Sequence, residues 1–343
     1  MHSVVDLFCG IGGLTHGFLK EGFNVVAGID IDPTCEYPFK RNNSAQFILK
    51  SVEDLSANDI LRLYPKGDTK ILVGCAPCQP FSKYTNRKSE DNKWQLVGTF
   101  AELICGVQPD VVSMENVPQL EQHPVFYEFL KTLKDQGYYS WWTIVDCVDY
   151  GVPQKRHRLV LFASKLGEIR IIRPTHPPCR HRTVRHAIER LEPIEAGQAS
   201  HLDCIHRSSA LSDLNLRRIK ATPAGGGWRH WEDDLRLKCH KTEKGKSYGS
   251  VYGRMKWDEP SPTMTTECHG LGNGRFGHPE QDRAISLREA ALLQTFPRYY
   301  SLLEPRTDLV VSTVARHIGN AVPIRLGRII ARSIMRHLEA YDA

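Results

Sequence analysis

The sequence HSVVDLFCGIGG, residues 2–13, decides the fold. Residues 2–8 are apolar and β-prone, which is typical of a strand. Glycines end the quoted stretch, and residues 14–21 then have the pattern of a helix. Residues 23–30, FNVVAGID, predict a second strand that ends at Asp30. A strand, a glycine-rich turn, a helix and a second strand predict the first βαβ unit of a nucleotide-binding α/β domain.

The glycine-rich turn suggests a ligand. Glycines at a strand–helix junction let a ligand approach the backbone, and the helix N-terminus favours an anionic group. The spacing GxGG differs from the dinucleotide fingerprint GxGxxG, which disfavours a nicotinamide cofactor. An acidic residue at the position of Asp30 suits the ribose hydroxyls of an adenosine-containing cofactor. A tight turn that binds nothing is the structural alternative.

The alternation of strands and helices continues to about Arg173 and predicts a parallel sheet with crossover helices. The further expected strands are 71–75, 111–116, 140–146 and 159–164, and the further expected helices are 33–41, 96–107 and 125–136. After Arg173 a proline- and histidine-rich segment follows, and the alternation is lost.

Two domains are therefore expected. The fold class is α/β, with a Rossmann-like catalytic domain over residues 1–173 that is completed by about 308–343. A smaller, irregular domain covers 174–307. It includes a late helix at 286–296, SLREAALLQTF, which begins with a predicted capping box formed by Ser286 and Glu289. An apolar stripe over 323–337 predicts a final helix that returns to the first domain.

Composition narrows the class of protein. The chain has 343 residues, ten cysteines and a net charge of +6. It has no apolar run long enough to span a membrane and no secretory pattern, so we expect a cytoplasmic protein with reduced cysteines. Residues 174–283 carry 18 Lys/Arg against 14 Asp/Glu. This bias is compatible with a polyanionic partner, and a solvated surface is the alternative.

The segment GCAPCQPFS, residues 74–82, offers a nucleophile. Cys78 follows a predicted strand and is flanked by Pro77 and Pro80, which restrict the backbone of the loop. Ligands bind beyond the carboxyl ends of strands in open α/β sheets, and a thiolate there could attack a substrate. The CxxC spacing of Cys75 and Cys78 raises zinc as the alternative, but no second pair follows at a finger-like distance.

Two further segments carry polar side chains near strand ends. Glu115 in MENV, residues 114–117, could protonate or hold a substrate ring, or could merely cap a turn. In QKRHR, residues 154–158, Arg156 and Arg158 could share one face of an extended segment and bind a phosphate or a base carbonyl. A basic strand edge on a solvated face is the alternative for these arginines.

With these motifs in order, the chain resembles the DNA (cytosine-5)-methyltransferase family of prokaryotic restriction–modification systems over nearly its whole length. The similar segments are DLFCGIGG, APCQPFS, ENV, QKRHR, REAALLQTFP and, at 319–323, GNAVP. The resemblance implies transfer of a methyl group from S-adenosylmethionine to carbon 5 of cytosine in a specific double-stranded DNA sequence. It also implies a covalent cysteine adduct and a flipped-out base, and it places a target recognition domain at residues 174–283.

The resemblance also implies residue roles. Cys78 would be the nucleophile, and Glu115 would hold and protonate the cytosine ring with Arg156 assisting. Gln154 and Arg158 would order the site. The cofactor would contact Phe8, Gly10, Ile11, Gly12, Gly13, Asp30, Ile31, Ser51, Val52, Pro77, Leu96, Asn320 and Ala321. The family often has Asp-Ile where this chain has Ser51-Val52, so a serine would replace the acidic contact to the adenine, or Glu53 would substitute for it.

The expected partner is double-stranded DNA. Candidate substrate contacts are Ser82, Arg229, Arg254, Thr263 and Thr265, and Lys83 to Lys93 could form a loop that closes on DNA. Four Cys/His pairs, at 179/181, 204/206, 239/240 and 268/269, raise zinc, but their irregular separations favour no metal. We further expect a monomer, and a cognate restriction endonuclease as a possible partner. A tRNA cytosine-5 methyltransferase is the alternative function.

Overall fold

The computed structural model describes residues 1–77 and 95–342, the side chain of Lys244 excepted. Its internal contacts divide the chain into two compact units. The first unit consists of Met1–Tyr150, His157–Thr175 and Val322–Ala343, and the second of Gly151–Arg156 and His176–Ala321. Within the described residues, no helix is both long and apolar enough to cross a membrane.

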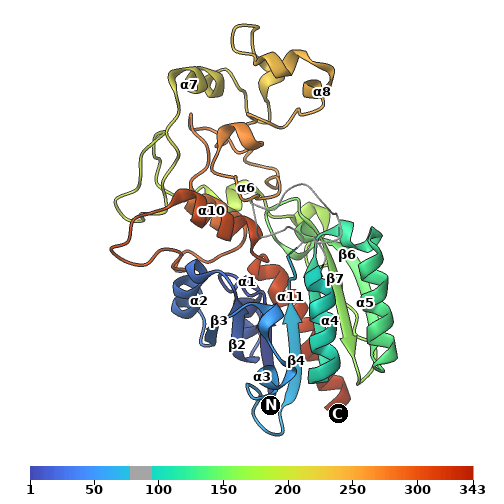
Figure 1. Cartoon of the computed structure of the whole chain (residues 1–343). Coiled ribbons are helices and arrows are strands. Elements are labelled where there is room, and N and C mark those ends of the chain that lie inside the picture. The colour runs from blue at the N-terminus through green and yellow to red at the C-terminus, as the bar shows by residue number, and fades with distance from the viewer. Residues whose placement is uncertain (78–94, 343) are drawn as a thin grey trace. The chain divides into compact units, whose positions relative to one another are not determined.

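A seven-stranded sheet with the order β3-β2-β1-β4-β5-β7-β6 forms the centre of the first unit (Figure 1). The strands are β1 His2–Leu7, β2 Asn24–Asp30, β3 Gln46–Leu49, β4 Thr69–Gly74, β5 Val111–Asn116, β6 Tyr139–Asp146 and β7 His157–Ser164. The strands β1 to β5 pair in parallel, as the sequence predicted. The sequence predicted a parallel sheet with crossover helices, and it did not predict that β7 runs antiparallel to both β5 and β6. Antiparallel neighbours need no long crossover, and none separates β6 from β7.

Helices cover both faces of this sheet, as in doubly wound folds. They are α1 Gly13–Lys20, α2 Glu36–Asn42, α3 Ala57–Leu61, α4 Gln95–Val107, α5 Pro124–Asp135 and α11 Ile324–Asp342. The largest core cluster joins α3, α4 and α5 to strand residues such as Leu7, Leu72 and Met114. On the other side α1 packs along α11, so the last helix does return to the first unit (Figure 1).

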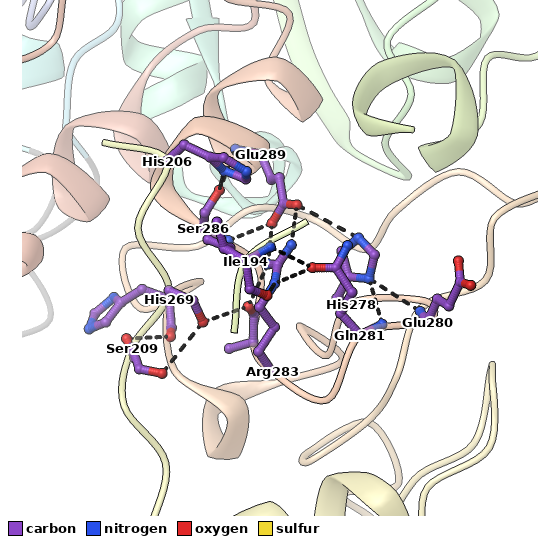
Figure 2. Close-up of polar contacts among 12 residues, drawn as sticks. Ile194, His206, Ser209, His269, His278, Glu280, Gln281, Arg283, Ser286 and Glu289 are labelled. Carbon is purple, nitrogen blue, oxygen red and sulfur yellow. Dashed lines mark hydrogen bonds and ion pairs between the residues drawn. The ribbon is translucent and has the colours of Figure 1, made fainter. Parts of the chain in front are cut away.

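The second unit is built mostly from loops around short helices. Its helices are α6 Val184–Ile188, α7 Asp213–Lys220, α8 Glu243–Lys246, α9 Leu287–Leu293 and α10 Val311–Asn320. The predicted capping box of α9 is present: the Ser286 side chain accepts a hydrogen bond from the Glu289 N–H, and the Glu289 side chain accepts one from the Ser286 N–H (Figure 2). Helix α9 ends at Leu293, short of the predicted Phe296, and α10 was not predicted.

The division by contacts differs from the expected domain boundaries at two places. Residues 151–156 and 308–321 group with the second unit, whereas the sequence analysis assigned both to the first domain. Residues 174 and 175 lie with the first unit. Compactness does not establish which residues work together, so the functional boundaries stay a prediction.

Candidate active site

The glycine-rich loop between β1 and α1 has an unusual backbone. Phe8 has a φ of 58°, in the left-handed region that bulky residues seldom adopt. Gly10 and Gly12 follow with φ values of 51° and 83°. A Cβ built on Gly10 would meet no atom within 4 Å, so the backbone there borders open space. Strained residues gather where a loop serves a ligand, and this loop has the form that the sequence predicted for a cofactor site.

Asp30, at the end of β2, holds this loop in place through a hydrogen bond. Its Oδ2 accepts a hydrogen bond from the Gly10 N–H at 2.7 Å, and its Oδ1 accepts one from the Asp32 N–H at 2.9 Å. Burial raises the pKa of Asp30, against the opposing effect of these two N–H donors. Beside it, the side chain of Ile31 is 50% exposed, which is unusual for so apolar a residue. An acidic group beside an exposed apolar surface suits a ribose and a base.

Asp6 is a buried carboxyl that the sequence analysis gave no role. It lies near the end of β1, and its Oδ2 accepts a hydrogen bond from the Thr15 hydroxyl at 2.6 Å. Its Oδ1 has no hydrogen-bond partner in the described parts of the chain. Burial raises the pKa of Asp6 to about 7. A buried acidic residue at the end of a central strand was the only signal that could have found it.

The other expected cofactor residues of the first unit lie at strand and helix ends. The Ser51 hydroxyl accepts a weak hydrogen bond from the Glu53 N–H at 3.3 Å, so it caps a single turn. Val52 is buried and belongs to the main core cluster, and Leu96 in the first turn of α4 packs against that cluster. These positions leave the expected adenine contacts of all three residues as predictions.

Glu115 is paired with an arginine at the end of β5. The Glu115 Oε1 lies 2.9 Å from the Nε of Arg158, and the two side chains are only 7% and 13% exposed. Pairing of the strands explains the contact, since Glu115 is opposite Val160 in β7 and Arg158 lies two residues earlier on the same face. A buried carboxyl held by a guanidinium at the carboxyl end of a parallel strand is a candidate acid–base group.

Contacts that the structure describes hold both arginines of QKRHR, and their roles in the reaction stay predictions. Arg158, which was expected only to order the site, is the arginine beside Glu115. Arg156, which was expected to assist Glu115, precedes β7 and belongs to the second unit. There its guanidinium donates to the carbonyls of Met264 and Gly319. Gln154, expected to order the site, is fully buried in the same network.

The cysteine loop begins in the described part of the chain and continues beyond it. Pro77 is half-buried, whereas Cys78, Ser82 and the segment Lys83 to Lys93 lie outside the described residues. The Asn116 side chain donates to the carbonyl of Ala76 at 2.9 Å and so holds the start of the loop, a role that the sequence analysis missed. Burial raises the pKa of the Cys75 thiol well above its ordinary value, so Cys75 is unsuited to be the nucleophile.

Arg254 corrects one expectation, that this arginine contacts DNA. It is only 5% exposed. All five of its N–H donors are used inside the second unit, on the carbonyls of Thr222, His278, Gln281 and Ile219 and on the carboxylate of Asp282. Arg254 therefore has a structural role, since a buried guanidinium with no spare donor cannot bind a base or a phosphate.

The remaining candidates for DNA contact are more accessible. Arg229 is exposed, stacks on Trp228, and donates to the Lys246 carbonyl. The Thr263 hydroxyl donates to the Lys155 carbonyl at 2.6 Å, and Thr265 is exposed. Among the histidines raised for zinc, His206 binds Ser286 and the Glu192 carbonyl, and His240 stacks on Trp228.

Solved structures share the fold of this chain. A prophage-encoded structure from Escherichia coli, described as a DNA modification methyltransferase, aligns with 99% of this chain and 100% of its own at a TM-score of 0.74 and 21% identity. The Dnmt2 methyltransferase of S. pombe aligns with 100% of each chain at a TM-score of 0.63 and 17% identity. The fold is that of the S-adenosylmethionine-dependent methyltransferases.

Sequence comparison identifies the family. The model of the C-5 cytosine-specific DNA methylases matches residues 2–336, so the chain belongs to this family and is a DNA cytosine-5 methyltransferase. The Type II methylase M.HgiDII of Herpetosiphon aurantiacus is 54% identical over 98% of this chain and 96% of its own. The Type II methyltransferase M.XorII of Xanthomonas oryzae is 28% identical over 97% and 84%. This kinship with Type II methylases makes the chain an enzyme of the restriction–modification type.

Proposed function

We propose that this enzyme transfers a methyl group from S-adenosylmethionine to carbon 5 of a cytosine in one double-stranded DNA sequence, with Cys78 as the nucleophile. The observation that carries the proposal is the buried contact between Glu115 and Arg158 at the end of β5. It provides a held carboxyl at the same sheet edge to which the loop containing Cys78 is attached through Asn116. An acid and a nucleophile are the two groups that the reaction requires of the protein.

The first unit fits S-adenosylmethionine. The backbone at Gly10 offers an open loop. The half-buried carboxylate of Asp30 offers a ribose acceptor, and the exposed side chain of Ile31 offers an apolar surface. By resemblance, Phe8 would lie near the adenine, and Asn320 and Ala321 would contact the methionine end. When bound, the sulfonium cofactor supplies an electrophilic methyl group.

The protein's own residues prepare the cytosine for this group. The Cys78 thiolate adds to carbon 6 of the ring, and the electron pair of the C5–C6 double bond becomes available at carbon 5. Glu115 gives a proton to ring nitrogen 3, where negative charge would otherwise develop, so this proton transfer stabilises the transition state. Arg158 fixes the carboxyl in place throughout. After methylation, a water molecule takes the proton from carbon 5, and the electron pair of that C–H bond re-forms the C5–C6 double bond. The C6–S bond then breaks to release Cys78 as a thiolate, and nitrogen 3 returns its proton to Glu115.

The target base must leave the helix before this chemistry. Stacking shields carbon 6 in a duplex, and extrusion of a base costs a few kcal/mol, which contacts in the pocket and groove must offset. Ser82, Arg229, Thr263 and Thr265 are proposed to make such contacts. We further propose that the enzyme acts as a cytoplasmic monomer and shares its target sequence with a restriction endonuclease.

Covalent trapping tests the proposal. Duplexes containing 5-fluorocytosine cannot lose a proton from carbon 5, so the wild-type enzyme should be retained on them as a denaturation-resistant adduct when S-adenosylmethionine is present. Cys78→Ser should form no adduct while still binding the cofactor. Cys105→Ser, which alters a half-buried thiol on α4, is the matched control and should be trapped normally. Substantial methyl transfer by Cys78→Ser would refute the assignment.

DNA is favoured over tRNA as the substrate. The curated relatives that match along nearly the whole chain are named Type II methylases. Radiolabelled methyl transfer to duplex DNA of mixed sequence and to total tRNA should label the DNA alone. Preferential labelling of tRNA would establish the alternative function instead.

A further inference from the structure

Gln294 follows the last residue of α9 and is fully buried in the second unit. Its Nε2 donates to the carbonyls of Ile318 at 2.8 Å and Ala321 at 3.3 Å. Its Oε1 accepts a hydrogen bond from the Nε2 of Gln154 at 3.0 Å. Both amide hydrogens and the amide oxygen are therefore used, and the side chain can adopt only one orientation.

The network continues through Gln154, which is also fully buried. Its Nε2 donates a second hydrogen bond to the Leu293 carbonyl at 3.2 Å, and its Oε1 accepts one from the Met264 N–H at 2.9 Å. The guanidinium of Arg156 lies 3.5 Å from that same oxygen. One connected set of polar side chains thus joins segments of the second unit that are distant in sequence.

The segment 318–321 receives most of these hydrogen bonds. It forms the end of α10, where carbonyls have no partner within the helix. Gln294 binds the carbonyls of Ile318 and Ala321, and Arg156 binds that of Gly319 at 3.2 Å. A Cβ on Gly319 would lie 2.4 Å from the backbone of Thr265, so the segment is also closely packed. Side chains from elsewhere, rather than a sheet, fix the path of this backbone.

We propose that Gln294 is a positioning residue for cofactor binding, because it sets the backbone of Asn320 and Ala321. The inference rests on the proposed function, in which those two residues contact the methionine end of S-adenosylmethionine. The family resemblance covers the segment that contains Gln294 but gives this side chain no role. The contacts of Gln294 indicate such a role, because its amide donates to one carbonyl before Asn320 and to one after it.

The test removes the Nε2 donor of Gln294 and keeps the size of the side chain. Gln294→Glu keeps the size of the side chain but directs a second acceptor at two carbonyls, so the segment 318–321 should shift. We expect the KM for S-adenosylmethionine to rise about tenfold, kcat to change less than about threefold, and the KM for DNA to stay the same. Cofactor Kd, measured by calorimetry without DNA, should rise as KM does.

Gln281→Met is the matched control. The Gln281 Oε1 accepts hydrogen bonds from the Ile194 N–H and from the Nε of Arg283, so its loss should also destabilise the second unit. In the described part of the chain, the Gln281 side chain accepts its hydrogen bonds from Ile194 and Arg283 and not from segment 318–321. Its substitution should therefore leave the KM and Kd for the cofactor unchanged. Comparison of the two variants separates positioning from a general loss of stability.

A pH series gives an independent readout. Protonation of the new carboxyl in Gln294→Glu restores one donor, so the ratio of its cofactor Kd to that of the wild type should fall as the pH is lowered. If Gln294→Glu does not fold, Gln294→Met replaces it in the experiment. Gln294→Met should also raise the cofactor Kd above that of the wild type. Variants of Gln294 that lower the melting temperature yet bind the cofactor like Gln281→Met would overturn the inference. Wild-type protein that binds the cofactor but never methylates DNA would overturn the proposed function instead.

Discussion

Acid should destabilise the second unit through one buried imidazole, that of His278. Its side chain is 2% exposed, and its Nδ1 accepts hydrogen bonds from the N–H groups of Glu280 and Gln281 (Figure 2). The hydrogen of the neutral ring is therefore on Nε2, which lies 3.7 Å from the carboxylate of Glu289. Burial lowers the pKa of His278 to about 4, although Glu289 opposes the shift.

The lowered pKa of His278 determines the direction in which pH changes the stability of the second unit. Because the folded-state pKa lies below the ordinary value of 6.5, folding excludes a proton from His278. Its contribution to stability is complete above pH 6.5 and is lost as the pH falls toward 4. The full difference of 2.5 pH units corresponds to about 3 kcal/mol, and about 2 kcal/mol of this should be lost between pH 7.5 and pH 5. Glu289, whose pKa is held down by Arg283 despite burial, stays ionised over that interval.

The assay is urea denaturation followed by tryptophan fluorescence at pH 7.5 and pH 5. His278→Asn is the comparison, because its side-chain oxygen can accept the same two N–H groups but does not titrate. The wild type should lose about 2 kcal/mol more than the variant on acidification, since all other histidines contribute equally to both. Equal losses in the two proteins would refute the reasoning, whatever their stabilities at pH 7.5.

Three further predictions concern single arginines. Arg158→Gln should lower kcat by about a hundredfold with little change in cofactor affinity, because Glu115 loses the group that holds it; steady-state kinetics and calorimetry would check this, and an unchanged kcat would contradict it. Arg254→Gln should destabilise the second unit by about 3 kcal/mol or more, since buried carbonyls and Asp282 lose their partner, as thermal unfolding would show. Arg229→Gln should instead leave the free energy of unfolding nearly unchanged and reduce the slope of log DNA affinity against log salt concentration by about one. A loss of stability in Arg229→Gln but not in Arg254→Gln would contradict the roles inferred from burial.

The first unit was largely predictable because its signals are local. Apolar, β-prone runs predicted β1, β2 and β5 within a residue or two, and the pattern of Ser286 and Glu289 predicted the start of α9. The reversal of β7 was not predictable in this way. A buried strand has the same apolar pattern in either direction, and only its pairing with β5 reveals the direction.

The different surroundings of Arg156 and Arg158 were not predictable for a related reason. Arg156 and Arg158 are two residues apart, so alternation alone places them on the same face of an extended segment. The strand begins only at His157, however, and Arg156 lies before it in the other unit. Sequence reasoning found the residue types and the place but could not locate the boundary that separates their surroundings, since element ends are set by tertiary contacts.

The recognition region shows why basic composition is a weak guide to DNA contacts. The described residues of the second unit form isolated β-bridges but no strand, so other groups must bind many of its backbone carbonyls. Buried arginines provide part of these hydrogen bonds. Arg283, which is fully buried, binds the carbonyls of Ile194 and Ala284 and pairs with both oxygens of Glu289 (Figure 2). Arg254 does the same for four other carbonyls. A guanidinium has five donors in one plane, so it can join several loops where no sheet is present. Part of the positive charge in residues 174–283 therefore holds the fold together, and contacts to DNA must be sought among exposed side chains such as Arg229.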